Sequence, residues 1–266
     1  MQKIFITGAS SGIGEALAFE YAKRYAHGKA CIGLVARRSE HLHAIASQIQ
    51  SQYQITCAIY VCDVRDQFAL QQAAQHFIQH YGVPNIVIAN AGASTGTLTE
   101  HVEDVKAFQA VMEINLMGMV HTFQPFIQAM KITAKNGEQA QLVGIASVAG
   151  IRGLPGAGAY CASKAAAITY LESLRVELQS FNIYVTTIAP GYIRTPMTDI
   201  NHYPMPFLMD ADVFARKFIL AVAQKKRFVI IPWQMSLLAK IMRLIPPVLW
   251  DWMMKNAPHK ARINIK

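Results

Sequence analysis

Charged side chains are scarce in this chain, and acidic ones are the scarcer kind. Of its 266 residues, 15% are charged and 53% are hydrophobic, with 16 Asp and Glu against 25 Lys and Arg. A chain with so few charges and so many apolar residues can bury enough surface to fold, which excludes a disordered chain. Its length fits one core of the size typical of a single α/β domain.

Cysteine is also rare. The chain has four cysteines, Cys31, Cys57, Cys62 and Cys161. No pair has C-x-x-C spacing and no cluster of histidines accompanies them, which excludes a disulfide framework and a zinc site. We therefore expect no metal, and thiols that are reduced and mostly buried.

A secretion signal is lacking as well. Residues 1–6 lead directly into a turn at Thr7-Gly8, without the apolar region and cleavage site of a signal peptide. We therefore expect an intracellular, cytoplasmic protein.

The shortage of acidic residues is concentrated at one end of the chain. Residues 1–224 hold 16 basic and 15 acidic side chains, whereas residues 225–266 hold nine basic ones against the single acid Asp251. In that tail the basic residues alternate with Met, Leu and Ile instead of forming a polar stripe, and no recognition motif accompanies them. The charge therefore does not indicate a nucleic-acid partner.

Apolar runs of strand length alternate along the chain with segments of helical period. Strands are predicted from residue 3, and at 30–36, 56–61, 86–89, 141–146, 184–189 and 228–231, with helices at 13–25, 67–81 and 160–179. Near-continuous Val, Ile and Ala strands separated by helices indicate a parallel sheet covered on both faces. The predicted fold is a doubly wound α/β sheet of the Rossmann type.

We predict one domain over residues 1–232 and a helical, basic and apolar extension over residues 233–266. Residues 195–212 contain three prolines and few regular patterns, and they follow the carboxyl end of a predicted strand. Ligands bind at that end of such a sheet, so this segment is predicted to be a substrate lid.

A glycine-rich turn follows the first strand. It reads Thr7-Gly8-Ala9-Ser10-Ser11-Gly12-Ile13-Gly14 and leads into a helix. Glycines allow the backbone to turn tightly and approach a pyrophosphate, and the free N–H groups at the helix start favour an anion. The position between a strand and a helix favours a dinucleotide site over a plain turn.

The end of the second strand indicates which dinucleotide binds. An NAD site usually has an acid there that binds the ribose 2′-hydroxyl, but this strand ends in Ala36-Arg37-Arg38, with the next acid at Glu40. Guanidinium groups bind phosphate in bidentate fashion, so Arg37, and after it Arg38, are candidates for a 2′-phosphate. We expect NADP(H) in preference to NAD(H), with Ser10 as a further phosphate ligand.

Tyr160 and Lys164 are four residues apart, which places a phenol and an ammonium on one face of a helix. A charge about 4–5 Å away is worth about 3 to 4 kcal/mol, enough to lower the pKa of the phenol toward the physiological range. Tyr25 and Lys29 have the same spacing, but Gly28 lies between them where a helix should end. Only Tyr160 follows a strand whose end carries a serine, Ser147, that can donate to a carbonyl oxygen.

These motifs together resemble those of the short-chain dehydrogenases/reductases, of the compact, single-domain, NADP-preferring type. The resemblance covers about residues 1–195 and rests on motifs in the family's order. They are Thr7-Gly8-x-x-x-Gly12-Ile13-Gly14, Asp63-Val64, Asn90-Ala91-Gly92, Asn115, Ser147, Tyr160-x-x-x-Lys164 and Pro190-Gly191.

The resemblance implies four catalytic residues. Tyr160 would exchange a proton with the substrate oxygen, and Ser147 would polarise the carbonyl. Lys164 would lower the pKa of the tyrosine and bind the nicotinamide ribose, and Asn115 would hold a water of the proton relay. The implied cofactor contacts come from Thr7, Gly8, Ser10, Ser11, Gly12, Ile13, Gly14, Arg37, Arg38, Asp63, Val64, Asn90, Ala91, Gly92, Tyr160, Lys164, Pro190, Gly191, Ile193 and Thr195.

The chain departs from the family pattern at two positions. Ala89 stands where a second asparagine is frequent, and we expect only a structural effect because Asn90 remains. Ser11 stands where some NADP-preferring members carry a basic residue, so the NADP preference depends on Arg37 and Arg38.

The tail has an apolar stripe at helical spacing, with Lys240 and Arg243 outside it. The stripe consists of Met235, Leu237, Leu238, Ile241 and Met242. The apolar run is too short to span a bilayer and Pro246-Pro247 interrupts it. Two alternatives are equally favoured: peripheral contact with an anionic membrane, and a contact with a second subunit of a homodimer or homotetramer or with the substrate pocket. Packing on the protein's own core ranks below both.

The leading hypothesis is an NADP(H)-dependent oxidoreductase that interconverts a carbonyl and a secondary alcohol. An apolar substrate is expected, because no charged cluster is evident near the predicted lid apart from Arg152 and Arg194, and the lid offers several apolar side chains. These side chains are Ile200, Tyr203, Met205, Phe207, Leu208 and Met209. Lipid-like ketones, steroid-like compounds and 3-oxoacyl groups all fit this expectation. The alternatives are a non-catalytic cofactor-binding scaffold, against which the intact Tyr160 and Lys164 pair argues, and a membrane-surface adaptor that acts through its tail.

Overall fold

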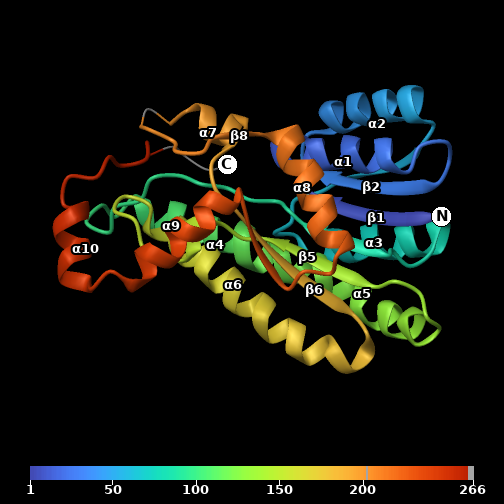
Figure 1. Cartoon of the computed structure of the whole chain (residues 1–266). Coiled ribbons are helices and arrows are strands. Elements are labelled where there is room, and N and C mark those ends of the chain that lie inside the picture. The colour runs from blue at the N-terminus through green and yellow to red at the C-terminus, as the bar shows by residue number, and fades with distance from the viewer. Residues whose placement is uncertain (202, 263–266) are drawn as a thin grey trace.

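Seven parallel strands form the central sheet of the part of the chain that the structure, a computed structural model, describes: residues 1–201 and 203–262 (Figure 1). The strands are β1 (Gln2–Thr7), β2 (Ala30–Ala36), β3 (Thr56–Val61), β4 (Ile86–Ala89), β5 (Gln141–Ile145), β6 (Tyr184–Pro190) and β9 (Phe228–Ile231). Their spatial order is β3-β2-β1-β4-β5-β6-β9, and every neighbouring pair is parallel. The strand order reverses between β1 and β4, which is where doubly wound sheets bind ligands.

Helices cover both faces of this sheet (Figure 1). One face carries α1 (Gly12–Arg24), α2 (Ser39–Tyr53) and α8 (Ala211–Ala223); the other carries α3 (Gln67–Tyr81), α5 (Gly118–Lys135) and α6 (Gly158–Leu178), with α4 (Asp104–Met112) packed on α6. Along β1, Ile4 and Ile6 belong to the first core and Phe5 to the second. Because both faces of the sheet are covered, the strands are mostly apolar and do not alternate regularly between apolar and polar residues. The chain is a single doubly wound α/β domain, as predicted.

The predicted strands at 30–36, 56–61, 86–89 and 228–231 are confirmed to the residue, as is the helix at 67–81. The strand predicted at 141–146 ends at Ile145, although the amide of Ala146 still donates to the carbonyl of Ile188 at 2.7 Å. The two other predicted helices are shifted by one or two residues toward the N-terminus. The ends of helices and strands depend on local hydrogen bonds, so a prediction from the sequence places them to within one or two residues.

Short elements complete the connections. They are the π-helical turn η1 (Glu113–Met117), the 3₁₀ turns η2 (Val148–Gly150) and η3 (Gln179–Phe181), the helix α7 (Pro196–Asp199) and the strand pair β7 (Ile193–Arg194) and β8 (Met209–Asp210). The pair β7–β8 joins the two ends of the predicted lid, and Arg194 and Asp210 form an ion pair at 2.8 Å there. The predicted lid therefore begins and ends at the strand pair β7–β8, and it contains the short helix α7.

The tail forms α9 (Trp233–Leu244) and α10 (Pro247–Met254), separated by the proline pair. The stripe that the sequence predicts on α9 does not face one environment: Met235 is buried, whereas Leu237 and Ile241 are exposed. The apolar arc of this helix is wider than its contact with the domain, so the protein covers only part of it. In the part of the chain that is described, no helix combines the length and the apolar character that crossing a bilayer requires.

After α10 the chain returns across the domain as an extended segment, residues 258–262, which we call the C-terminal strap (Figure 1). The strap lies against the loop that follows β4. The amide of Gly96 donates to the carbonyl of Ala261 at 2.9 Å, and the ammonium of Lys260 donates to the hydroxyl of Ser94 at 2.9 Å. The tail thus contacts the domain at the start of α9 and again at the C-terminal strap.

Candidate active site

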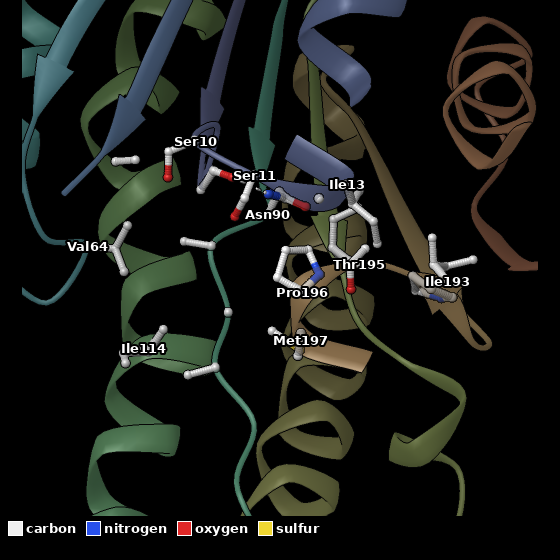
Figure 2. A pocket seen from close by; sticks show the side chains of 18 of the residues that line it. Ser10, Ser11, Ile13, Val64, Asn90, Ile114, Ile193, Thr195, Pro196 and Met197 are labelled. Carbon is white, nitrogen blue, oxygen red and sulfur yellow. Dashed lines mark hydrogen bonds between the residues drawn. The ribbon is translucent and has the colours of Figure 1, made fainter. Parts of the chain in front are cut away.

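A cavity of about 450 Å³ opens at the carboxyl ends of the central strands (Figure 2). It brings together most of the residues that the sequence singles out. They are Gly8, Ser10, Ser11, Gly12, Ile13, Arg37, Arg38, Asp63, Val64, Asn90, Ala91, Gly92, Ser147, Tyr160, Lys164, Pro190, Gly191, Ile193 and Thr195. Thr7, Gly14 and Asn115 lie behind this lining and hold it in place.

The glycine-rich turn between β1 and α1 lines the cavity. Gly12 is the first residue of α1, and Ser11 before it is extended and makes no side-chain cap, so the amides at this helix start remain directed outward. A Cβ on Gly14 would lie 2.6 Å from the side-chain nitrogen Nδ2 of Asn90 and would overlap the carbonyl oxygen of Gly8. Only glycine lets α1 start this close to β1, which gives an anion access to the positive end of the helix.

Thr7 and Asn90 join the ends of β1 and β4. The hydroxyl oxygen of Thr7 accepts from the amide of Asn90 at 3.2 Å, and the side chain of Asn90 donates to the carbonyls of Thr7 and Gly8 at 3.0 and 3.1 Å. These bonds fix the turn relative to the switch point of the sheet. Asn90 therefore positions the turn as well as lining the cavity.

The side chain of Arg38 binds the glycine-rich turn at Ser10 and Ser11. Its guanidinium donates to the hydroxyl of Ser10 at 3.0 Å and to that of Ser11 at 2.6 Å. Arg37, about half exposed, lies 3.5 Å from the carboxylate of Asp63. Although burial disfavours the charge of Asp63, hydrogen bonds from Arg65 keep its pKa below the ordinary value. The region combines the guanidinium groups of Arg37, Arg38 and Arg65 with two hydroxyls and the carboxylate of Asp63.

Ser147, Tyr160 and Lys164 meet at the far end of the cavity. Ser147 follows β5 and is buried, and its hydroxyl accepts from the amide of Ala149 at 3.1 Å. Tyr160 and Lys164 lie one turn apart on α6. Burial raises the pKa of Tyr160, and a hydrogen bond with the hydroxyl of Ser147 acts in the opposite direction.

Lys164 is almost fully buried and donates to the carbonyl of Ile145 at 2.8 Å. Its ammonium lies 5.8 Å from the centre of the Tyr160 ring. Burial lowers the pKa of Lys164 to about 8. The sequence predicts that this ammonium brings the pKa of the phenol down. In the structure burial raises the pKa of Tyr160, and the ammonium of Lys164 is directed toward the carbonyl of Ile145.

Asn115 lies in the π-helical turn η1 and is buried. Its side chain accepts from the amide of Ala93 at 2.8 Å and donates to the carbonyl of Ala93 and the hydroxyl of Ser163 at 3.0 and 2.9 Å. It thereby joins the loop after β4 to α6, between Tyr160 and Lys164. Wide turns of this kind occur often at functional sites.

Nine further residues that are not among the predicted site residues line the cavity. Six of them are Ala36, Cys62, Ala93, Ile114, Ile145 and Ala146, and the other three, Pro196, Met197 and Thr198, belong to the segment predicted as a substrate lid. Most adjoin a motif residue, which is the signal that could have found them. Thr198 is positioned by a capping box with Thr195 at the start of α7, in which the hydroxyl of Thr198 accepts from the amide of Thr195 at 3.0 Å.

Tyr25 and Lys29, which repeat the spacing of Tyr160 and Lys164, take no part in this site. Helix α1 ends at Arg24, so the two side chains do not share a helix face, and Lys29 is exposed. The sequence-based choice of Tyr160 is consistent with this placement.

The four cysteines are free, and burial raises the pKa of the cavity-lining Cys62 to about 11. Across residues 1–201 and 203–262, no three His, Cys, Asp or Glu side chains gather in a way that could hold a metal ion.

The cavity suits a dinucleotide. The uncapped start of α1 and the close approach of Gly14 form a cradle for a pyrophosphate. The phenol of Tyr160, the buried ammonium of Lys164 and the hydroxyl of Ser147 line the same cavity. A doubly wound fold with this site defines a nucleotide-dependent oxidoreductase of CH–OH and C=O groups. The chain belongs to the short-chain dehydrogenase family, whose model matches residues 2–203.

Curated relatives agree with this assignment. An uncharacterized oxidoreductase of Myxococcus xanthus is 31% identical over 246 residues, which are 92% of this chain and 93% of that protein. The 11-beta-hydroxysteroid dehydrogenase 1A of Arabidopsis thaliana is 28% identical over an alignment of 267 positions that covers 94% of this chain and 73% of that protein.

Solved structures share the fold at lower identity. An alcohol dehydrogenase of Thermococcus sibiricus, complexed with 5-hydroxy-NADP, has a TM-score of 0.77 at 22% identity and covers 87% of this chain and 96% of its own. The L-sorbose reductase of Gluconobacter frateurii, complexed with NADPH and L-sorbose, has a TM-score of 0.75 at 24% identity and covers 86% and 94%.

Proposed function

We propose that this oxidoreductase uses NADP(H) to interconvert a carbonyl and a secondary alcohol on an apolar substrate. The observation that carries the proposal is one cavity with Arg37 and Arg38 at one end and Ser147, Tyr160 and Lys164 at the other. A cofactor-binding scaffold would have no need for the second group. The proposed catalytic residues are Ser147, Tyr160, Lys164 and Asn115.

The residues of the chain would act as follows. The hydroxyl of Tyr160 donates its proton to the carbonyl oxygen in reduction and takes one from the alcohol in oxidation. The hydroxyl of Ser147, already bonded to that of Tyr160, holds the same oxygen. Lys164 supplies a positive charge one helical turn away, and Asn115 fixes the loop and the helix between which the reaction occurs. Bound at this site, the nicotinamide supplies or accepts the hydride.

The proposed preference for NADP(H) has two supports. Strand β2 ends at Ala36 and is followed by Arg37 and Arg38, not by the acid that binds a ribose 2′-hydroxyl at this position in NAD sites; the nearby carboxylate of Asp63 accepts from Arg65. The guanidinium of Arg38 and the hydroxyls of Ser10 and Ser11 lie together beside the cavity, with Arg37 next to them. This is a suitable set of donors for a 2′-phosphate. The sequence ranks Arg37 first, whereas the cluster of hydroxyls around Arg38 makes it an equal candidate.

An apolar substrate agrees with the charges around the catalytic end. Arg194 is paired with Asp210, and Arg152 donates to the carbonyls of Met242 and Ile245 at 2.6 Å each. Both cations are thus occupied within the protein. Relatives named as 11-beta-hydroxysteroid dehydrogenases are consistent with a lipophilic ketone or alcohol. We further propose a cytoplasmic homodimer or homotetramer without nucleic acid, with peripheral membrane contact through its tail.

A substrate panel tests this function. NADPH absorbance is followed with purified protein and three kinds of ketone: steroid, long-chain aliphatic and sugar. We expect faster oxidation of NADPH than of NADH, with apolar ketones preferred over sugars. NADPH binding without turnover on any ketone, and no oxidation of the matching alcohols with NADP⁺, would instead identify a scaffold.

A further inference from the structure

Helices α9 and α10 expose an unusual number of large apolar side chains. On α9 these lie at intervals of four, four and three residues, and therefore on one side. We call the exposed set the tail patch: Trp233, Leu237, Ile241 and Leu244 on α9, and Val248, Leu249, Trp252 and Met253 on α10. Trp252 is 75% exposed and Leu244 is 82% exposed. Apolar surface concentrated in this way marks a contact site.

The tail patch is fixed to the catalytic domain. At the start of α9, Met235 packs against Gly191, which lines the cavity. Near its end, Arg152 donates to the carbonyls of Met242 and Ile245, and its guanidinium lies 4.6 Å from the ring of Trp250. Arg152 belongs to the loop that joins Ser147 to the helix of Tyr160. The patch therefore has a set position beside the substrate side of the site.

The charges around the patch indicate its partner. Lys240, Arg243 and Lys255 are exposed on or next to the two helices, and the sequence from 225 to 266 contains Asp251 as its single acid. In a two-fold contact with a second copy, this basic surface would face itself and the like charges would repel. An anionic lipid surface complements both the charge and the exposed Trp, Leu and Ile side chains.

We propose that the tail patch docks the protein on an anionic membrane surface, with α9 and α10 lying in the lipid interface and the substrate side of the catalytic site held next to it. The docking itself does not depend on the reaction. The role that it would have, supply of a lipophilic carbonyl compound from the membrane, rests on the proposed function.

Tryptophan fluorescence gives a direct test, because the chain has three tryptophans and all of them, Trp233, Trp250 and Trp252, lie in α9 and α10. The full chain is mixed with vesicles of phosphatidylglycerol and, separately, of phosphatidylcholine. We expect sedimentation with the anionic vesicles, a blue shift of the emission, quenching by brominated lipid, and at least about ten-fold weaker binding to the neutral vesicles.

Two variants separate the apolar and the charged contributions. Leu237→Ser with Ile241→Ser should weaken vesicle binding at least about ten-fold, and so should Lys240→Glu with Arg243→Glu. Phe68→Ser with Ile132→Ser removes two apolar side chains from α3 and α5 that are 67% and 66% exposed, somewhat more than Leu237 and Ile241 at 58% and 50%, and should leave vesicle binding unchanged. NADPH binding without vesicles reports that each variant is folded.

Absence of vesicle binding and of quenching by the wild type would overturn the proposal, as would an equal loss in the Phe68 and Ile132 variant. If light scattering instead shows a dimer that the Leu237 and Ile241 variant dissociates, and no vesicle binding, a second copy covers the patch and the proposal fails. Ketone reduction without vesicles is measured in parallel, so a failure of docking is distinguishable from a failure of the proposed reaction.

Discussion

The guanidinium of Arg262 lies 2.9 Å from the carboxylate of Asp104, a residue 158 positions earlier in the chain. Asp104 starts α4 and also accepts from the amide of Leu98 at 2.8 Å, at the end of the loop that follows β4. A Cβ on Gly96, in the same loop, would overlap the carbonyl oxygen of Lys260. The pair therefore fastens the C-terminal strap to a loop whose first residues line the cavity.

Asp104→Asn should loosen the strap without unfolding the domain. The amide of Gly96, which donates to Ala261, should exchange its hydrogen faster, whereas the amide of Thr187 in the central sheet should be unaffected. Asp212→Asn is the control, because it removes the charge from an exposed pair with Arg216 on α8. Equal exchange at Gly96 in the wild type and in the Asp104 variant would show that the ion pair does not hold the strap.

The same contact should depend on pH only under acidic conditions. The amide of Leu98 and the guanidinium of Arg262 lower the pKa of Asp104 below its ordinary value. A carboxyl group with a lowered pKa in the folded state stabilises that state above the unfolded pKa of about 3.9, and the effect is lost as the pH falls through the folded value. Protection of Gly96, corrected for intrinsic exchange, should stay constant from about pH 7 to 5 and fall below about 4. A loss centred near pH 6 would point to a histidine instead.

Tyr160→Phe removes the hydroxyl that is proposed to exchange the proton and leaves the ring in place. We expect the rate of carbonyl reduction to fall by about 10² to 10⁴, with NADPH binding within about two-fold of the wild type. Tyr25→Phe is the matched control, since it changes the other tyrosine with a lysine four residues later and should leave the rate unchanged. Stopped-flow measurement of NADPH oxidation separates the chemical step from binding. A Tyr160 variant as fast as the wild type would mean that another group supplies the proton.

Arg37→Ala and Arg38→Ala should each weaken NADPH more than NADH. Losing a charge-assisted hydrogen bond to a phosphate costs about 1.5 to 3 kcal/mol, which corresponds to about a 10- to 100-fold change in NADPH affinity. Titration of both nucleotides into each variant measures this ratio, and Arg216→Ala on the surface of α8 provides the control. If a variant loses affinity for both nucleotides equally, that arginine does not bind the 2′-phosphate.

The sequence predicts the central sheet well because the strands are buried on both faces. Runs such as 30–36 and 86–89 are apolar throughout, and turn residues bound them, so composition alone marks their ends. The predicted site residues also come together, because they follow strands whose carboxyl ends meet at one edge.

Contacts between distant segments are what the sequence does not contain. Nothing near Arg262 or Lys260 indicates that they bind the loop after β4, because those bonds depend on the path of the chain after α10. The orientation of Lys164 toward Ile145 is likewise decided by the surrounding core and not by its spacing from Tyr160.

Lys164 also makes the protein less stable than it would otherwise be. Burial lowers its pKa from 10.5 to about 8, so the charged ammonium lowers the free energy of unfolding of the folded protein. Below about pH 8 both the folded and the unfolded states bind the proton, and the full cost, about 3 kcal/mol, is present. Between about pH 8 and 10.5 the unfolded state retains more protons than the folded state, so stability rises with pH and the cost disappears.

Lys164→Met should therefore increase the free energy of unfolding at pH 7 by about 1 to 3 kcal/mol, the lost bond to Ile145 reducing the gain. The advantage over the wild type should shrink from pH 8 to 10, while the variant loses carbonyl reduction. Urea unfolding at several pH values gives the free energy of unfolding of the variant and of the wild type. The difference between the two removes the contribution of other groups that titrate in this range, such as Lys260. Lys29→Met, at an exposed position, should show no such trend. A constant difference across this pH range would mean that Lys164 does not carry a lowered pKa in the folded protein.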